Sequence, residues 1–422
     1  LGIKNYGSRT IAMVRNNKEE LNRNFSEILS IHIIFSIIVI FVYLVLLFFF
    51  VEDNLVIFLI QSIYVFAAVF DINWFFFGIE KFKLTVGRNT LVKILSVFLV
   101  LVFVKTQTDL WIYALILALS VFVGQSVVWF ALKQYVSWRR PSWANMKQHI
   151  RPLFVLFLPI LALSLYKYMD KIMLGSISSN VQVGFYENAE KIINVPMSLI
   201  MAFGVVLMPR IANMVTSKDK GEVFKLIDMS MEAVMLLAIA ISFGLAGISF
   251  VLAPIFFGYE FEECGILIMG LAVTVPFMAF ANVIRTQYLI PYKEDKIFVV
   301  SLFLGAAVNL IVNIILIPYM AARGAVIGTI FAEIIVCIYQ SYFVRKKIFI
   351  KKYLLNTIPP ILIGIVMFVF VFQIGNVMNI NIVTLILQLL VGMFIYAVGV
   401  FLLMLKSRTR LMVLLRKFVV RY

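Results

Sequence analysis

The sequence is poor in charged residues for its length. Asp, Glu, Lys and Arg make up 14% of its 422 residues, whereas they make up about 25% of a soluble domain. Hydrophobic residues make up 63%, and the mean hydropathy is +1.04. This balance excludes an ordinary soluble globular protein and also a disordered chain, which requires low hydrophobicity. Long apolar runs also exclude an outer-membrane barrel, because its ~10-residue strands alternate polar and apolar residues.

Residues that bind metals or build redox sites are also scarce. The two cysteines, Cys264 and Cys337, lie in or beside apolar runs, and the two histidines, His32 and His149, are far apart in sequence. This pattern indicates no disulfide framework and no metal-ligand set. The sequence also has no glycine-rich phosphate loop and no large loop for an extramembrane catalytic surface. We therefore predict that the protein is not an enzyme and has no catalytic residues, metal or cofactor.

Long apolar runs are what the sequence has in abundance. A membrane-spanning helix needs about 20 mostly apolar residues. Twelve stretches meet this requirement, and their connections are short. They are residues 28–50, 55–77, 86–104, 110–132, 152–174, 192–214, 232–256, 264–290, 297–318, 324–344, 353–373 and 382–405. The sequence thus predicts an all-α polytopic membrane protein.

The basic residues are distributed unevenly among the loops. The formal net charge is +16, which membrane topology explains better than nucleic-acid binding. If residues 1–27 are cytoplasmic, the predicted inside segments hold 31 of the 37 Lys and Arg residues, and the outside loops hold three. Cytoplasmic loops of membrane proteins carry this excess. We therefore predict a multi-pass protein of the bacterial plasma (inner) membrane, with both ends of the chain in the cytoplasm.

A short repeat predicts the domain organisation. Residues 9–14 read RTIAMV and residues 210–215 read RIANMV, and each is followed by a lysine and an apolar run. A chance match is the alternative. A true repeat predicts an incomplete N-lobe over 1–132, a basic cytoplasmic linker over 133–151, a six-span C-lobe over 152–344, two additional spans over 345–405 and a basic tail over 406–422. Because the N-lobe has only four complete spans and the chain begins with Leu1, we expect the first helix and most of the second to be absent from this chain.

Six strings, in family order, resemble the polysaccharide flippase family (Wzx-like) of the multidrug/oligosaccharidyl-lipid/polysaccharide exporter superfamily. They are residues 1–12, the distinctive string 71–89 (DINWFFFGIEKF, ending in Arg88 and Asn89), 169–175, 208–211, 287–294 and 309–328. The resemblance implies two six-helix lobes in a V-shaped arrangement plus two C-terminal helices. It also implies flipping of undecaprenyl-diphosphate-linked oligosaccharides to the outer leaflet by alternating access, for capsule, exopolysaccharide or O-antigen biosynthesis. Implied partners are this substrate, membrane lipids and the polymerase and export proteins of the same pathway.

The sharpest group of ionisable residues within a predicted span is Lys167, Asp170 and Lys171. A charged group in a membrane span is costly and therefore often functional. Spacings of three and four place these residues on one face of a helix. The functional interpretation is a cationic patch for the diphosphate or sugar, with Asp170 holding the lysines in place. The alternative is a neutralised pair whose lysines reach the outer headgroups.

Three other ionisable residues are candidates for ion coupling or for buried pairing. Asp71 is expected to pair with Lys93 or Arg88, with cation coupling as the alternative. Glu333, near the middle of its span, fits a proton or cation site as well as it fits a hydrogen-bonded packing residue. Lys93 is close enough to the cytoplasmic end for its ammonium to reach water.

Arg9 and Arg210 occupy equivalent positions of the repeat at the predicted cytoplasmic mouth. Arginine suits bidentate contact with phosphate, so these residues are candidates for attracting the anionic headgroup. Arg285, near the inner end of its span, is a similar case. The alternative for all three is ordinary anchoring by positive charge on the inside.

Other functional classes remain as alternatives. A multidrug/cation antiporter or a peptidoglycan-precursor flippase would share the superfamily's fold. A polytopic polysaccharide polymerase or glycosyltransferase fits less well, because the chain lacks a sizeable extramembrane loop. A scaffold would need neither the predicted lobes nor lysines within a span.

Overall fold

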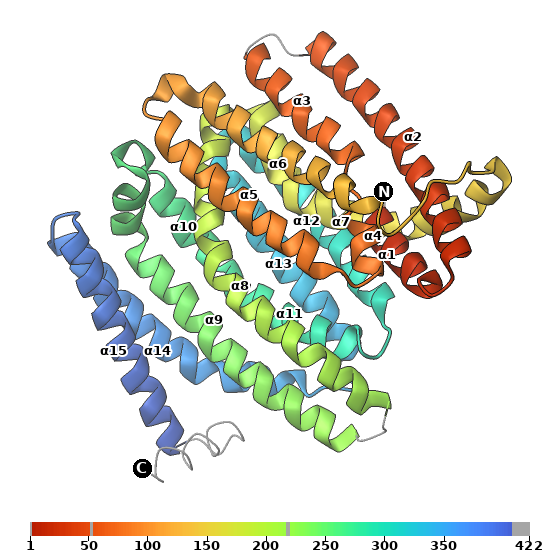
Figure 1. Ribbon diagram of the computed structural model, residues 1–422. Coiled ribbons are helices and arrows are strands. Elements are labelled where there is room, and N and C mark those ends of the chain that lie inside the picture. Colours follow the sequence, from red (N-terminus) through yellow and green to blue (C-terminus); the bar gives the residue numbers. More distant parts are fainter. Residues whose placement is uncertain (1, 51–53, 217–219, 407–422) are drawn as a thin grey trace. The chain divides into compact units, whose positions relative to one another are not determined.

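The computed structural model describes residues 2–50, 54–216 and 220–406 (Figure 1), and every regular element in these ranges is a helix. Eleven helices among them are long and apolar enough to cross a membrane. The twelfth predicted span, 152–174, lies within the continuous helix α7 (Trp143–Ile177), where several side chains are outside the described set. The predicted all-α, multi-pass architecture is therefore confirmed.

The chain divides into two compact units, residues 1–161 and 162–422, and the division falls inside α7. Each unit is described by itself. The finer division of the C-terminal part, with residues 345–405 outside a second lobe, stays a prediction.

Unit 1 is built around a cluster of aromatic and aliphatic residues that includes Phe25, Trp74 and Phe76. Its helices are α1 (Ile3–Val14), α2 (Lys18–Phe50), α3 (Leu55–Val69), α4 (Asn73–Gly78), α5 (Phe82–Phe103), α6 (Leu110–Leu132) and the first part of α7. Helix α1 packs on α4, and α3 packs on α6. Gly7 allows the α1–α4 approach, because a Cβ atom there would lie 2.6 Å from the ring of Trp74.

The predicted span 55–77 is interrupted where it reaches the end of α3. Helix α3 ends at Val69 and α4 begins at Asn73. The Asp71 carboxylate accepts a hydrogen bond from the backbone N–H of Asn73, at 3.0 Å. Asp side chains that bond the backbone two residues on favour a turn over a continuing helix, which explains the break.

The polar segment that precedes α7 is bound to α2. The backbone N–H groups of Ser137 and Arg139 donate to Asn22 Oδ1 and Ser26 Oγ, both at 2.9 Å. These side chains replace the partners that an irregular backbone lacks. The predicted linker 133–151 therefore consists of an irregular segment, residues 133–142, which we call the polar strap, and the first turns of α7.

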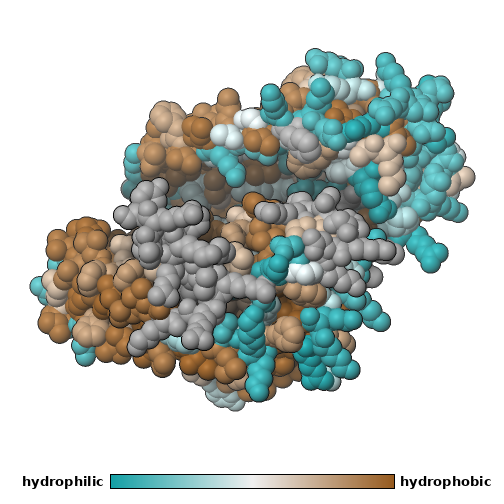
Figure 2. All heavy atoms as spheres, turned by 90° about the horizontal axis from the view of Figure 1, so that it is seen from below, coloured by the Kyte–Doolittle hydropathy of each residue, from teal (hydrophilic) through white to brown (hydrophobic). Residues whose placement is uncertain are grey.

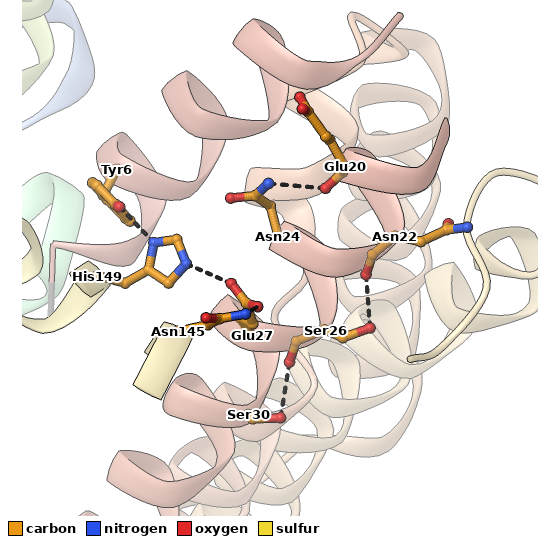
Figure 3. A network of polar contacts seen from close by, with 9 residues as sticks. All are labelled: Tyr6, Glu20, Asn22, Asn24, Ser26, Glu27, Ser30, Asn145 and His149. Carbon is orange, nitrogen blue, oxygen red and sulfur yellow. Dashed lines mark hydrogen bonds and ion pairs between the residues drawn. The ribbon is translucent and has the colours of Figure 1, made fainter. Parts of the chain in front are cut away.

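A buried chain of hydrogen bonds fastens those first turns (Figure 3). The His149 ring lies between the Tyr6 hydroxyl, 2.6 Å from Nδ1, and the Glu27 carboxylate, 2.9 Å from Nε2. Asn145 Nδ2 donates to the other Glu27 oxygen at 3.0 Å. Tyr6, Glu27 and His149 are 7%, 1% and 3% exposed. Three helices, α1, α2 and α7, are thus joined by polar contacts inside unit 1.

Unit 2 holds the larger hydrophobic cluster, to which α7 to α14 all contribute. Its helices are the rest of α7, α8 (Asn180–Thr216), α9 (Lys220–Phe257), α10 (Cys264–Ala272), α11 (Thr274–Ile284), α12 (Asp295–Met320), α13 (Ala322–Val344), α14 (Ile350–Val377) and α15 (Ile382–Lys406). The predicted span 264–290 is made of α10, α11 and a π-helical turn, Arg285–Leu289. Helices α14 and α15 pack on each other and on α9.

Large hydrophobic side chains remain exposed on both units. Phe48, Phe130 and Tyr319 are 80%, 81% and 85% exposed. In Figure 2, brown hydrophobic residues form broad areas, and teal hydrophilic residues gather in separate clusters. A soluble monomer rarely exposes such broad apolar areas, so these surfaces fit contact with lipid.

Candidate functional site

A cavity of about 610 Å³ in unit 2 contains four of the predicted site residues: Lys167, Asp170, Arg285 and Glu333. Helices α7, α8, α10, α11, α12 and α13 line it together with the turn Arg285–Leu289, and its other lining residues are both apolar and polar, Glu190 among them. A volume of this size is typical of a small-molecule site. The sequence grouped Arg285 with the residues of the cytoplasmic mouth, and the structure places it in this cavity.

Asp170 is the centre of a buried hydrogen-bond cluster. Its Oδ1 atom accepts from the side-chain amides of Asn309 and Asn313, at 2.8 and 2.7 Å. Its Oδ2 atom accepts from the hydroxyls of Tyr186 and Thr329, at 2.9 and 3.1 Å. We call these five residues the Asp170 cluster. It joins α7 to α8, α12 and α13 with neutral partners.

The prediction that Asp170 holds the two lysines in place is wrong. Asp170 is 5% exposed and its partners all come from other helices. Lys171 follows it directly, and adjacent residues of a helix do not face each other. Lys171 instead lies 2.8 Å from Glu190 and 4.0 Å from Glu187 on α8. The predicted cationic patch is therefore partly neutralised.

Two cations on the cavity wall keep no carboxylate partner. Within the described ranges, neither Lys167 nor Arg285 has a carboxylate oxygen within 4.0 Å. The Lys167 ammonium lies 5.5 Å from the centre of the Tyr168 ring. Arg285 Nη2 donates to Asn282 Oδ1 at 2.7 Å, and its guanidinium lies 5.3 Å from the Phe298 ring centre. The cavity wall thus carries two cations without a carboxylate in direct contact, beside the carboxyl groups of Asp170, Glu190 and Glu333.

Glu333, on α13, is 7% exposed and lines the same cavity. Across the part of the chain that the structure describes, it forms no ion pair within 4.0 Å. The structure therefore places this carboxyl group on the same wall as the Arg285 guanidinium, with which it interacts electrostatically without a direct ion pair. Its predicted role in ion coupling stays a prediction.

Sequence reasoning missed four members of the Asp170 cluster: Tyr186, Asn309, Asn313 and Thr329. The sequence did hold a signal for two of them. Asn309 and Asn313 are four positions apart in an apolar span and therefore share a helix face. Gly328 was a second signal. A Cβ atom there would lie 2.1 Å from Asn313 Oδ1, so only glycine allows α13 to approach this amide.

A second cavity, of about 580 Å³, lies in unit 1. Asp71 lines it, with Lys4, His32, Asn73, Trp74 and several phenylalanines. The expected ion pair of Asp71 with Arg88 or Lys93 is not formed. Asn73 stands between, donating to Asp71 Oδ1 at 2.7 Å and accepting from Arg88 Nη2 at 3.1 Å. Lys93 is exposed.

The two arginines of the repeat are less informative. Arg9 is exposed on α1. Arg210 lies in α8, but its side chain is outside the described residues. The surroundings of the two arginine side chains are therefore not compared. Their role at the mouth stays a prediction.

Residues 1–215 match the model of a protein family described as polysaccharide biosynthesis protein. The chain belongs to this family. Its similarity to the "Putative O-antigen transporter" of Shigella dysenteriae extends over 357 residues at 25% identity, covering 80% of this chain and 86% of that protein. The lipid II flippase MurJ of Bacillus subtilis is 28% identical over 224 residues, 49% of this chain and 41% of that protein.

Solved structures place this member of the polysaccharide biosynthesis protein family in a known transporter fold. The lipid II flippase MurJ in an inward closed conformation matches with a TM-score of 0.75 at 15% identity, covering 93% of this chain and 87% of that one. An outward-facing multidrug resistance transporter of the MATE family matches with a TM-score of 0.54 at 15% identity, covering 82% and 83%. At these identities the likeness shows the fold alone.

Proposed function

We propose that the protein flips undecaprenyl-diphosphate-linked oligosaccharide units from the cytoplasmic to the outer leaflet of the bacterial plasma membrane by alternating access. The coarse function, a flippase of a lipid-linked substrate, is supported by the family and by relatives named as an O-antigen transporter and a lipid II flippase. The pathway we propose is capsule, exopolysaccharide or O-antigen biosynthesis, with the polymerase and export proteins of that pathway as partners.

The observation that carries the finer proposal is the pair of cations, Lys167 and Arg285, on the wall of the unit 2 cavity. A diphosphate carries several acceptor oxygens and negative charge. Arginine binds such oxygens through a planar fork, and lysine acts as a point charge. Because neither cation has a carboxylate oxygen within 4.0 Å among the described residues, both can contact the ligand directly. Each charged hydrogen bond contributes about 1.5–3 kcal/mol.

An apolar groove on unit 2 supports the lipid part of the proposal. It has a volume of about 980 Å³ and is lined by α9, α14 and α15, with residues such as Leu236, Gly244, Met367 and Val400. Lipid tails are as apolar as the groove, so a polyprenyl chain already in the bilayer would be held there by van der Waals packing and not by leaving water. The groove offers such a chain a dry surface while its head is held elsewhere.

The test uses bacteria that lack their own flippase, in which lipid-linked repeat units remain in the inner leaflet. Export to the outer leaflet is measured with the wild-type protein and with the variant Lys167→Gln/Arg285→Gln. We expect export to fall at least about tenfold in the variant, since two charged contacts are lost. The matched control is Lys191→Gln/Arg323→Gln, which removes the same charge from two exposed ion pairs.

Normal export by the Lys167/Arg285 variant at equal membrane levels would contradict the assignment of the cavity. No export by the wild-type protein for several glycans, together with cation-dependent drug efflux, would favour the antiporter alternative.

The coupling ion is proposed to act at Glu333. A buried carboxyl group on the cavity wall can gain and lose a proton as the cavity changes its access to water. We expect Glu333→Gln to abolish the dependence of export on the membrane proton gradient and to leave lipid-linked substrate binding within about twofold. Retained proton dependence would remove Glu333 from the coupling mechanism. Asp71, the other coupling candidate, lines the unit 1 cavity.

A further inference from the structure

We propose that the unit 1 cavity binds the saccharide part of the substrate, so that it selects among glycans. This inference rests on the proposed function and adds a site to it. Some polar atoms of the cavity wall are already hydrogen-bonded within the protein, and others are left for a ligand.

Two atoms of the cavity wall are unused hydrogen-bond acceptors. The Asp71 carboxylate accepts two hydrogen bonds, from the backbone N–H and from the side-chain amide of Asn73. Both reach its Oδ1 atom. Among the described residues no hydrogen bond reaches its Oδ2 atom. His32 Nε2 lies 2.8 Å from the carbonyl oxygen of Ala68. Because a carbonyl only accepts, Nε2 carries the proton, and Nδ1 of the neutral ring is an acceptor.

The end of α3 brings these two residues together. The Ala68 carbonyl has no onward partner within the helix, as is usual in a last turn. It accepts from His32 Nε2 at 2.8 Å and from the backbone N–H of Asp71 at 3.2 Å. One backbone oxygen therefore holds the His32 ring and the Asp71 backbone, and both residues line the same cavity.

The same wall carries unused donors. Trp74 is 2% exposed and its indole N–H has no partner in the described ranges. Asn89 accepts from Arg88 through Oδ1, at 3.2 and 2.6 Å, which leaves its NH₂ group to donate. The Lys4 ammonium lies 5.8 Å from the centre of the Phe77 ring. A buried donor without a partner costs about 1–3 kcal/mol, so a ligand that accepts from Trp74 removes a cost.

This mixture of acceptors and donors distinguishes among ligands. Lys4 and Asp71 bring opposite charges to the cavity, which therefore has no net charge to attract a phosphate. A lysine disfavours a metal cation, and the described residues hold no group of three or more potential metal ligands. A hydrocarbon chain would leave all of these polar groups unpaired. Sugar hydroxyls both donate and accept, and therefore satisfy the whole set.

Aromatic rings supply the remaining surface. Phe35, Phe77, Phe154 and Phe157 line the cavity beside the polar groups. The electron-rich face of an aromatic ring attracts the positive edge of a C–H bond, and one face of a pyranose ring is covered with C–H groups. Apolar walls with a few placed polar groups are the usual form of a small-molecule site.

The proposal has a direct consequence for selectivity. A site built to hydrogen-bond a hydroxyl rejects an analogue that lacks it far more strongly than an apolar pocket rejects a change in size. The acceptors Asp71 and His32 would therefore decide which hydroxyl pattern is accepted.

The experiment is photo-crosslinking of the intact protein in lipid nanodiscs with two probes. Both are undecaprenyl diphosphate N-acetylglucosamine, with a diazirine on the sugar N-acyl group in the first and on the polyprenyl tail in the second. Labelled peptides are identified by mass spectrometry. We expect the sugar probe to label peptides that contain residues 71–77 or 154–157.

Two isosteric variants sharpen the result. Asp71→Asn keeps Oδ1 and converts the free acceptor into a donor. We expect it to lower sugar labelling of the unit 1 peptides about tenfold, as for the loss of one hydrogen bond, and to leave tail labelling within twofold. The matched control, Glu80→Gln, changes an exposed carboxylate of the same unit and should leave both labels unchanged.

The outcomes separate the two proposals. Tail labelling without sugar labelling of the unit 1 peptides overturns the saccharide site and leaves the flippase proposal standing. Unchanged sugar labelling in Asp71→Asn also overturns it. Absence of labelling by either probe contradicts the proposed function, and the saccharide site fails with it.

Discussion

Each unit buries a carboxyl group, and the two are satisfied by different chemistry. Asp170 of unit 2 accepts from two amides and two hydroxyls, all neutral. Glu27 of unit 1 contacts an ionisable ring, His149, and one amide. Asp170 lies within a predicted span, where a further charge is expensive. Glu27 precedes the predicted span 28–50, where water is nearer. A buried carboxyl group can therefore be satisfied either by neutral donors alone, as at Asp170, or with the help of an ionisable ring, as at Glu27.

The largest expected effect is the loss of stability when the buried carboxyl group of unit 2 is removed. Asp170→Ala removes the shared acceptor of four buried donors, and three of them, Tyr186, Asn313 and Thr329, keep a second acceptor within 3.1 Å. Because hydrogen bonds are lost and the Asn309 amide is left without this partner, at about 1–3 kcal/mol for an unsatisfied group, we expect a loss of about 4 kcal/mol in stability, measured as thermal unfolding of the protein in detergent. Asp170→Asn, which keeps one acceptor oxygen, should lose less. Equal stability of Asp170→Ala and wild type would show that the cluster is not a structural tie.

Glu27→Ala should have the next largest effect. It removes the acceptor for His149 and Asn145, so we expect a loss of about 3 kcal/mol. A double-mutant cycle with His149→Gln measures how much of this loss comes from their contact, because coupled residues are not additive. Additive losses would mean that the two side chains act independently.

Gly328→Ala tests the Asp170 cluster without removing any of its polar atoms. The new methyl group would meet Asn313 Oδ1, so the amide must move. Overpacking of this kind costs about 1–3 kcal/mol. The matched control is Gly184→Ala, where a Cβ atom meets nothing within 4 Å. A Gly328→Ala protein as stable as this control in the same unfolding assay would indicate that α13 can shift away.

Tyr6→Phe removes one hydroxyl from the buried hydrogen-bond network of Tyr6, His149 and Glu27 and keeps the ring. We expect a loss of about 1 kcal/mol, the usual net value of one hydrogen bond. Because the ring still packs edge-on to His149, thermal unfolding should shift only slightly. A loss of stability as large as that of Glu27→Ala would show that the whole hydrogen-bond network depends on this hydroxyl.

The smallest effect is expected at the exposed pair of Arg139 and Glu19, which are 58% and 83% exposed and 3.3 Å apart. Surface pairs contribute about 0–1 kcal/mol. Glu19→Gln should therefore change stability by less than about 0.5 kcal/mol and become still less important at high salt. A larger change would imply that the polar strap depends on charge rather than on its backbone hydrogen bonds.

The sequence predicted the helical architecture well, because a run of apolar residues long enough to span a bilayer has few other interpretations. It also identified Asp170, Arg285 and Glu333 as unusual residues in spans. Their partners could not be predicted. Asn309, Asn313 and Thr329 lie at least 139 residues from Asp170 in sequence, and helix periodicity describes only one helix at a time. The pairing of Asp71 with Arg88 failed for a related reason, since Asn73 lies between them.

The contact between Tyr6 and His149 joins residues 143 positions apart, and that between Glu27 and His149 joins residues 122 positions apart. During synthesis the chain must therefore extend past residue 149 before α1 and α2 find their polar partners. Until then, Glu27 and Tyr6 face the interior of an unfinished unit. The first turns of α7 thus act as the closing step in the biogenesis of unit 1, and a ribosome-bound chain that stops before residue 145 should remain open to proteases at α1.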